Sequence, residues 1–345
     1  MRNRPIVGSS VALAAITALG LLLASACSGG GSGAVATSSS RSSAVTPSPS
    51  ASAGVTETVR EIHDVFYEED PDGTEHELDV YLPTTEGGPW PVVVMLHGEG
   101  LGGAWLHEWA TAVAEQGAVV FVPTWIATAP PNAKVGMRLA WTEIDRMACA
   151  VRFARARAER YGGDPSNLAL FGHSGGGNIA ATVAFADPEV PQGCVARFGS
   201  LVPESLVLFE GGWLLPDPDW DALLAEDPDV VIDAMLPWPY LDGGDRMPVT
   251  ILLSEYGADS QWIDVEDPQA WMTLRDPSGE LGDEADQMGI FDDGRLDMRE
   301  MQALLLHRVD ALGYEASLDT LPESDHTSLS EEGLQVLVDV ILQRT

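Results

Sequence analysis

The sequence predicts a doubly wound α/β domain with a mostly parallel sheet. Two observations support this prediction: short continuous apolar runs recur along the chain, and segments with a helical spacing of apolar residues separate them. Runs that are apolar at every position fit strands buried on both faces, as the strands of a parallel sheet are. Alternation of such strands with helices is typical of a sheet covered on both sides, whose ligands bind at the carboxyl ends of the strands.

The strands are predicted from the apolar runs and from the turn formers between them. Residues 60–68 and 77–82 flank Pro71-Asp72-Gly73, which predicts an antiparallel pair at one edge of the sheet. Another strand is predicted over residues 314–318. The runs that predict strands buried on both faces lie at 91–96, 118–122, 168–171, 205–209 and 249–253.

The helices are predicted in the segments between these strands. The last one follows Ser328-x-x-Glu331, which has the pattern of a capping box. The helical patterns cover residues 104–116, 135–161, a small-residue stretch after Ser174, 298–312 and 331–343.

The first 26 residues have the pattern of a signal peptide, which predicts an exported protein. Two arginines precede a mostly apolar run over residues 11–23, which ends in Ala24-Ser25-Ala26 before Cys27. The run is shorter than the ~20 residues that span a bilayer. The exit site resembles a bacterial lipobox, which implies cleavage before Cys27, a lipid on its sulfur and attachment to the outer face of the cell membrane. The alternative is ordinary cleavage and secretion.

The next segment, residues 27–55, is rich in Ser, Gly, Ala, Thr and Pro. Such a composition buries too little apolar surface to order itself, so we expect a flexible stalk. The folded domain is predicted over residues 56–345. Cys149 and Cys194 lie within it, and the sequence leaves open whether they form a disulfide or stay separate buried thiols.

The charge of the chain narrows the choice of partners. Acidic residues number 53 against 18 basic ones, the net charge is −35, and Lys134 is the only lysine. A basic face that neutralises phosphates is therefore not expected, which argues against nucleic acid as a partner. We interpret the acidity as a solvated surface that keeps an exported protein soluble.

A candidate nucleophile lies between the strand predicted at 168–171 and the helix after it. The sequence there is Gly172-His173-Ser174-Gly175-Gly176. A serine on a sharp strand-to-helix turn needs strained backbone angles, and glycines two residues before and after it allow the chain to approach closely. The pentapeptide is common in glycine-rich chains, so its place between strand and helix carries the prediction. No lysine follows that would indicate a phosphate loop.

This region resembles a known family. Residues 161–177, from Tyr161 through Ser174 to Gly177, are similar to the nucleophile region of α/β-hydrolase carboxylesterases, including the hormone-sensitive-lipase-like and feruloyl-esterase-like branches. The similarity extends to 148–160, 78–83 and 91–98, covers most of the chain from about residue 60, and is weakest between 211 and 300. The resemblance implies an α/β-hydrolase fold with cap-like insertions, a small-molecule ester as substrate, and no cofactor.

An oxyanion hole is predicted from two backbone segments, because ester cleavage passes through a tetrahedral oxyanion that backbone N–H groups stabilise. One donor is expected from Gly175, directly after the nucleophile, and the other from Gly98 or Glu99 in the loop after residues 91–96. The family has glycine where Glu99 stands. A carboxylate near a forming anion opposes it unless the side chain points away.

The base and the acid are expected at the carboxyl ends of later strands. His326 follows the strand predicted at 314–318 and precedes the last helix, whereas His307 lies in a helical pattern, so we predict His326 as the base. The acid that orients this histidine is expected after residues 249–253. Asp259 is the preferred candidate there, and Glu255 is the alternative.

Two insertions are predicted near residues 211–247 and 260–295. The first contains Trp213 and Trp238, which we predict either to bind substrate as part of a cap or simply to bury themselves. The second ends in a spacing similar to half a calcium loop, but Gly289 and Phe291 occupy the first two ligand places, so no metal is expected.

The sequence therefore favours a serine hydrolase that cleaves carboxylic esters through an acyl-enzyme on Ser174. A serine peptidase uses the same chemistry and remains an alternative. A catalytically silent surface protein that binds a ligand is the second class, and Glu99 and the acidic insertions motivate it. A fluorophosphonate probe that labels Ser174 separates an enzyme from a silent binder.

Overall fold

The computed structural model describes residues 58–125, 133–188, 190–213, 236–243, 246–257, 262–265, 267–276, 278–292 and 294–343. All described residues belong to one unit of the chain, Val55–Thr345. The predicted signal peptide, Cys27 and the predicted stalk up to residue 55 lie outside the described residues. Within the described part, every helix is too short or too polar to cross a lipid bilayer.

The described residues form a central sheet of eight strands. In chain order these are β1 (Val59–Glu69), β2 (Glu75–Pro83), β3 (Trp90–Leu96), β4 (Val119–Pro123), β5 (Gly163–His173), β6 (Ser205–Phe209), β7 (Val249–Ser254) and β10 (Ala316–Leu321). Their order across the sheet is β1-β2-β4-β3-β5-β6-β7-β10. β2 pairs antiparallel with both β1 and β4, and all other neighbours are parallel. The predicted mostly parallel sheet with an antiparallel edge is confirmed.

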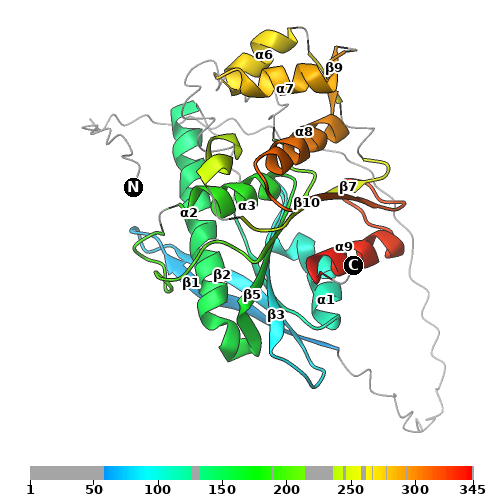
Figure 1. Ribbon diagram of the computed structural model, residues 1–345. Helices are drawn as coiled ribbons and strands as arrows, with labels where there is room; N and C mark the ends of the chain where they lie inside the picture. The colour runs from blue at the N-terminus through cyan, green and yellow to red at the C-terminus, as the bar shows by residue number, and fades with distance from the viewer. Residues whose placement is uncertain are drawn as a thin grey trace, which may run out of the picture. The chain divides into compact units, whose positions relative to one another are not determined.

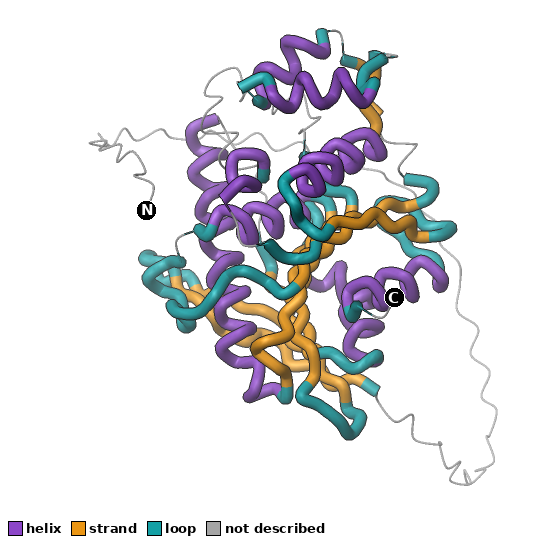
Figure 2. The backbone as a smooth tube through the Cα atoms, viewed as in Figure 1, coloured by secondary structure: helices purple, strands orange, loops and turns teal. Residues whose placement is uncertain are grey.

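Helices cover both faces of this sheet (Figures 1 and 2). α2 (Ala133–Arg157), α3 (Gly175–Ala186) and α8 (Met298–Ala311) supply buried residues on one face; α1 (His107–Glu115) and α9 (Glu331–Ile341) supply them on the other. Alternate residues of β3 enter the two layers: Val92 and Val94 pack with α2 and α3, and Val93 and Met95 pack with α1 and α9. Full burial of each such side chain stabilises the fold by about 1.5–3 kcal/mol.

The cap of α9 differs from the predicted one. Ser330, not Ser328, precedes the helix, and its Oγ accepts a hydrogen bond from the backbone N–H of Gly333 at 2.8 Å. Ser328 lies in the preceding turn, where its carbonyl accepts from the N–H of Asp325. Either serine satisfies a short capping pattern, and the turn around Asp325 decides which one reaches the helix.

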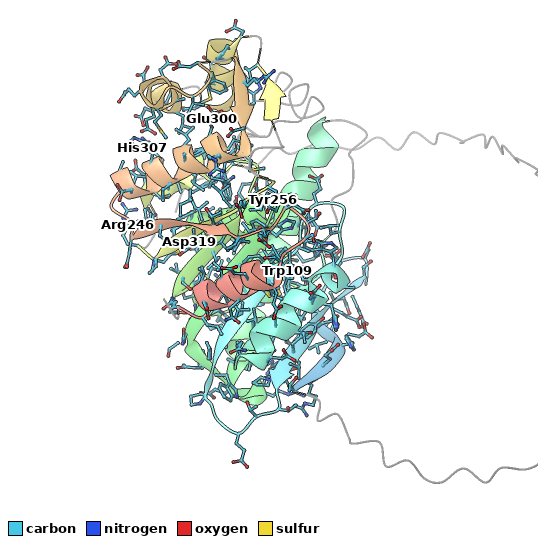
Figure 3. The ribbon with its side chains drawn as sticks, turned by 90° about the vertical axis from the view of Figure 1, so that its right-hand side faces the viewer. Trp109, Arg246, Tyr256, Glu300, His307 and Asp319 are labelled. Carbon is cyan, nitrogen blue, oxygen red and sulfur yellow. A yellow bond between two sulfur atoms is a disulfide. The ribbon has the colours of Figure 1, made fainter. Side chains whose placement is uncertain are left out.

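The second insertion contains α6 (Pro268–Arg275), α7 (Glu280–Met288) and a two-stranded sheet of β8 (Trp262–Asp264) and β9 (Arg295–Asp297). Glu300, at the last place of the calcium-like spacing, lies at the start of α8 (Figure 3). There it forms a capping box with Asp297, in which each side chain accepts the other residue's backbone N–H. Helix capping therefore accounts for this carboxylate.

The structure joins Cys149 on α2 to Cys194 in a disulfide, which the sequence left open. Cys194 lies in the segment after α3 and forms an isolated bridge with Glu68 of β1. The bond closes a loop across 45 positions, a length at which a disulfide stabilises a fold by about 3–4 kcal/mol. The disulfide therefore ties the segment before β6 to α2, and the isolated bridge ties the same segment to the outer strand β1.

Candidate active site

Ser174 occupies a sharp turn between β5 and α3. Its φ of 53° and ψ of −124° are strained for a residue with a side chain, and its N–H donates to the carbonyl of Phe209 at 2.8 Å. The turn is possible because Gly172 and Gly176 lack side chains. A Cβ on Gly172 would collide with the backbone of Gly176, and one on Gly176 would collide with the backbone of His97. The predicted strand, turn and helix around Ser174 are thus observed.

His326 lies in the loop between β10 and α9, close to this turn. Its carbonyl accepts a hydrogen bond of 2.7 Å from Nε2 of His173, and the two imidazole rings lie 4.7 Å apart between centroids. The loop is shaped by Asp325, whose carboxylate accepts the backbone N–H groups of Thr327 and Ser328. His326 is therefore held against the residue that directly precedes Ser174, although it is remote in sequence.

A buried carboxylate contacts the imidazole of His326 through Nδ1. Oε2 of Glu210 lies 2.6 Å from Nδ1 of His326, and Glu210 is fully buried directly after β6. Its other oxygen, Oε1, accepts both the backbone N–H and the hydroxyl of Ser254, at 2.6 and 2.5 Å. Three donors thus compensate for the burial of this carboxylate.

Glu210 was not among the predicted acids, which were placed after β7. Glu255 follows β7, but its side chain accepts the backbone N–H of Glu323 at 2.7 Å and is solvent-exposed. Asp259 lies outside the described residues. The end of β7 instead supplies Ser254, which holds Glu210. The usable signal in the sequence is a glutamate directly after the apolar run 205–209, at the edge of the sheet where ligands bind.

The predicted oxyanion loop follows β3 and lies against the start of α3. A Cβ on Gly175 would lie 3.3 Å from the backbone nitrogen of Glu99, so these two predicted donors are neighbours. Gly98 lies against the ring of His173 on the same side. Glu99 itself is solvent-exposed. The backbone segments expected to bind an oxyanion therefore converge beside Ser174.

His97 fixes the backbone of this loop. Its Nε2 accepts the backbone N–H of Trp125 at 3.1 Å, so Nδ1 carries the proton that it donates to the carbonyl of Gly98 at 2.8 Å. The indole of Trp125 donates to the carbonyl of His97 and stacks on its ring at 5.3 Å. Burial lowers the pKa of His97, which keeps the ring neutral in this role.

The structure separates the two predicted substrate-binding tryptophans. Trp213 is fully buried, and its indole donates to the amide oxygen of Gln302 on α8 at 2.6 Å. Its assignment as a substrate contact is corrected, because a residue enclosed in this packing has no face for a ligand. Trp238, in the 3₁₀ helix η3 (Trp238–Gly243), is half-buried and donates to the carbonyl of Trp213. Its contact with substrate stays a prediction.

The described residues include no cluster of three or more His, Cys, Asp or Glu side chains arranged to hold a metal ion. At the carboxyl edge of the sheet, His326 pairs with Glu210 instead. A serine on a strained turn, an imidazole with a buried carboxylate behind it and two converging backbone segments suit nucleophilic attack on a carbonyl group.

Comparison with known proteins supports this chemistry over part of the chain. Residues 78–194, about a third of the chain, match the BD-FAE family. Carboxylesterase NlhH of Mycobacterium tuberculosis is 37% identical over 116 residues, which cover 32% of this chain and 34% of that protein. The chain thus matches about a third of the length of this curated relative.

Solved structures resemble the chain over most of its length. A butyrate-bound thermophilic esterase, Est2 of Thermogutta terrifontis, has a TM-score of 0.55 at 15% identity and covers 82% of this chain and 94% of its own. Brefeldin A esterase, a bacterial homologue of human hormone-sensitive lipase, has a TM-score of 0.52 at 18% identity. The alignment covers 88% of this chain and 79% of the esterase. Together with the sheet order and the turn at Ser174, these likenesses show that the chain has the α/β-hydrolase fold.

Proposed function

We propose that the chain is a serine carboxylesterase in which Ser174 is the nucleophile, His326 the base and Glu210 the acid. The observation that carries the proposal is the 2.6 Å hydrogen bond between His326 Nδ1 and Glu210 Oε2, next to a serine on a nucleophile turn. The partial likeness to carboxylesterase NlhH supports the ester as substrate.

The hydrogen bond sets the protonation of the imidazole. A buried carboxylate with both oxygens engaged accepts a hydrogen bond from the Nδ1–H group of His326, which keeps the proton on Nδ1 and leaves the lone pair on Nε2 as the base. Nε2 takes the proton of the Ser174 hydroxyl while its oxygen attacks the ester carbonyl. The same proton then passes to the leaving alcohol. Water attacks the acyl-enzyme in the second half, with His326 again as base and then acid.

The tetrahedral intermediate needs donors on its oxygen. We assign these to the N–H groups of Gly175 and of the loop at Gly98 and Glu99, which lie side by side. A single such donor contributes about 10²–10³-fold to the rate in enzymes of this type. The Glu99 side chain is solvent-exposed, so water screens its charge, and its presence does not argue for a silent protein.

The experiment is hydrolysis of a series of nitrophenyl esters, with peptide nitroanilides of matched size as the comparison. We expect turnover of the esters that Ser174→Ala abolishes, while Ser317→Ala, at an exposed serine on β10, leaves it unchanged. Turnover of peptides with little ester activity would assign a peptidase instead. A folded protein that hydrolyses neither class and resists a fluorophosphonate would be a silent binder.

We also propose that the protein is exported and anchored by a lipid on Cys27. The signal-like residues 1–26 and the lipobox-like site support this placement, and so does the disulfide between Cys149 and Cys194, because disulfides persist in oxidising compartments. When the full chain is expressed in a bacterial host that lipidates such sites, the protein should enter the detergent phase in Triton X-114 partition. Cys27→Ala should move it to the aqueous phase, and a wild-type protein already in the aqueous phase would indicate secretion.

A further inference from the structure

His173 is a buried histidine that the proposed chemistry does not use. It is 1% exposed and precedes Ser174 at the end of β5. Trp105 of η1 (Gly103–Leu106) stacks on its ring at 4.8 Å, and the rings of Trp109 and Phe209 lie 5.5 and 5.1 Å away. Surroundings of this kind suit an apolar side chain better than an imidazole, so the choice of histidine needs an explanation.

The ring makes one hydrogen bond, and its direction is fixed. The carbonyl of His326 can only accept, so Nε2 of His173 carries the proton and donates it over 2.7 Å. Burial, together with the nearby His326, lowers the pKa of His173 to about 3, which keeps the ring neutral. The proton on Nε2 therefore leaves Nδ1 as a bare acceptor.

Nδ1 of His173 is buried and has no hydrogen-bond partner among the described residues. Gly98 of the oxyanion loop lies against it, since a Cβ on that glycine would come within 2.9 Å of Nδ1. A buried acceptor without a partner is unfavourable for stability. The unpaired Nδ1 destabilises the fold, whereas Nε2 of the same ring forms a hydrogen bond to the loop of His326. This hydrogen bond is the interaction that an apolar side chain at position 173 could not make.

We propose that His173 is a positioning residue for the reaction, because its N–H holds the backbone of His326 against the nucleophile turn. This inference rests on the proposed function of Ser174 and His326. Glu210 fixes the imidazole of His326 through Nδ1, and His173 fixes the main chain of the same residue through its carbonyl. Two attachment points define where Nε2 of His326 meets the serine: Glu210 sets the direction of the ring, and His173 ties the main chain of this residue to the end of β5.

The test compares two variants of similar shape. The amide of His173→Gln can place an N–H donor near the position of Nε2, whereas His173→Met fills a similar volume without a donor. A positioning role predicts that Met lowers kcat by about 10- to 100-fold with little change in KM, and that Gln recovers most of the loss, because small misplacements of catalytic groups are costly. A packing role predicts the opposite order, since the thioether suits an apolar site better than an amide. His307→Gln, at an exposed position on α8, is the control (Figure 3).

A second measurement uses only the wild-type protein, so its result does not depend on whether a variant folds. Nitrogen NMR of histidine-labelled wild-type protein should show His173 as a neutral ring with its proton on Nε2 from pH 5 to pH 8. A proton on Nδ1, or protonation of the ring in this range, overturns the proposal, as does a Met variant as active as wild type. If the wild-type protein hydrolyses no ester and Ser174 stays unlabelled, the proposed function fails, and the NMR result still reports whether His173 holds the loop.

Discussion

Two buried glutamates in this protein have opposite surroundings. Glu210 is fully buried, and its two oxygens receive the imidazole of His326 and both donors of Ser254. Glu68, at the outer strand β1, is 1% exposed, yet its Oε2 has no hydrogen-bond partner among the described residues and lies 4.0 Å from Nε of Arg146. The guanidinium of Arg146 donates instead to Asp70 and Glu143.

The comparison shows that burial alone does not determine what a carboxylate does. Burial raises the pKa of Glu68 to about 7 against the opposing effect of Arg146, and the nearby carboxylates of Asp70 and Glu143 raise it further. The donors around Glu210 hold both of its oxygens in place beside a base. We therefore expect replacement of Glu210 to affect catalysis, and replacement of Glu68 to affect stability and its dependence on pH.

The largest effect is expected from Glu210→Gln. Ser254 donates to Oε1, so the amide oxygen takes that place and the amide NH₂ faces His326. An NH₂ group there forces the imidazole proton onto Nε2, which removes the base, and we expect kcat to fall by about 10²–10⁴-fold. Ester hydrolysis measured with and without the substitution checks this. A loss below about threefold would assign the acid to another carboxylate.

Glu68→Gln should change stability instead of turnover. The unfolded chain has this carboxyl at its usual pKa of 4.5, and the folded chain has it at about 7. Between these values the folded state binds more protons, so wild-type stability falls as pH rises through the window. The amide of the variant does not titrate, so its stability lacks this dependence on pH. We expect the difference in free energy of unfolding, variant minus wild type, to be about 1–3 kcal/mol larger at pH 8 than at pH 5.

Urea unfolding at the two pH values measures this difference. Glu204→Gln, at a glutamate that pairs with Arg155 nearer the surface, serves as the matched control and should not reproduce the pH-dependent gain. If Glu68→Gln and wild type differ by the same amount at both pH values, Glu68 is already charged in the folded protein and the comparison fails.

The smallest effect is expected from Glu255→Gln. This exposed side chain accepts a backbone N–H from the turn before His326 but does not contact the imidazole. Surface substitutions of this kind change the free energy of unfolding by about 0.5 kcal/mol or less. Because the side chain does not contact the imidazole, we expect kcat to change by about twofold or less. Asp259→Asn should be assayed beside it. A large loss in either variant would restore the acid predicted from the sequence.

The sequence predicts the local parts of this molecule well and its long-range contacts less well. Apolar runs and turn glycines are local signals, so the sheet, its helices and the turn at Ser174 could be predicted. The contact between Glu210 and His326 joins residues 116 positions apart. The glutamate after the apolar run 205–209 is a local signal for a candidate acid, but which strand end lies nearest the last loop is decided by tertiary contacts.

The same reason explains the other differences. The sequence around Trp213 is compatible with a cap, but in the structure its indole is buried against Gln302. The sequence spacing of Cys149 and Cys194 does not give the distance between their sulfurs, so the disulfide could not be predicted. The cap of α9 was predicted at Ser328 but lies at Ser330, because the turn at Asp325 sets where the helix starts. In each case a tertiary contact selects among options that the local sequence allows.

The most direct test of the account is intact-mass spectrometry of the folded protein after incubation with a fluorophosphonate, followed by peptide mapping. We predict one phosphonyl group per chain, located on Ser174, with a rate of labelling that Glu210→Gln lowers by at least about tenfold. A folded protein that gains no mass, or that carries the group on a different serine, would contradict the assignment of Ser174, His326 and Glu210.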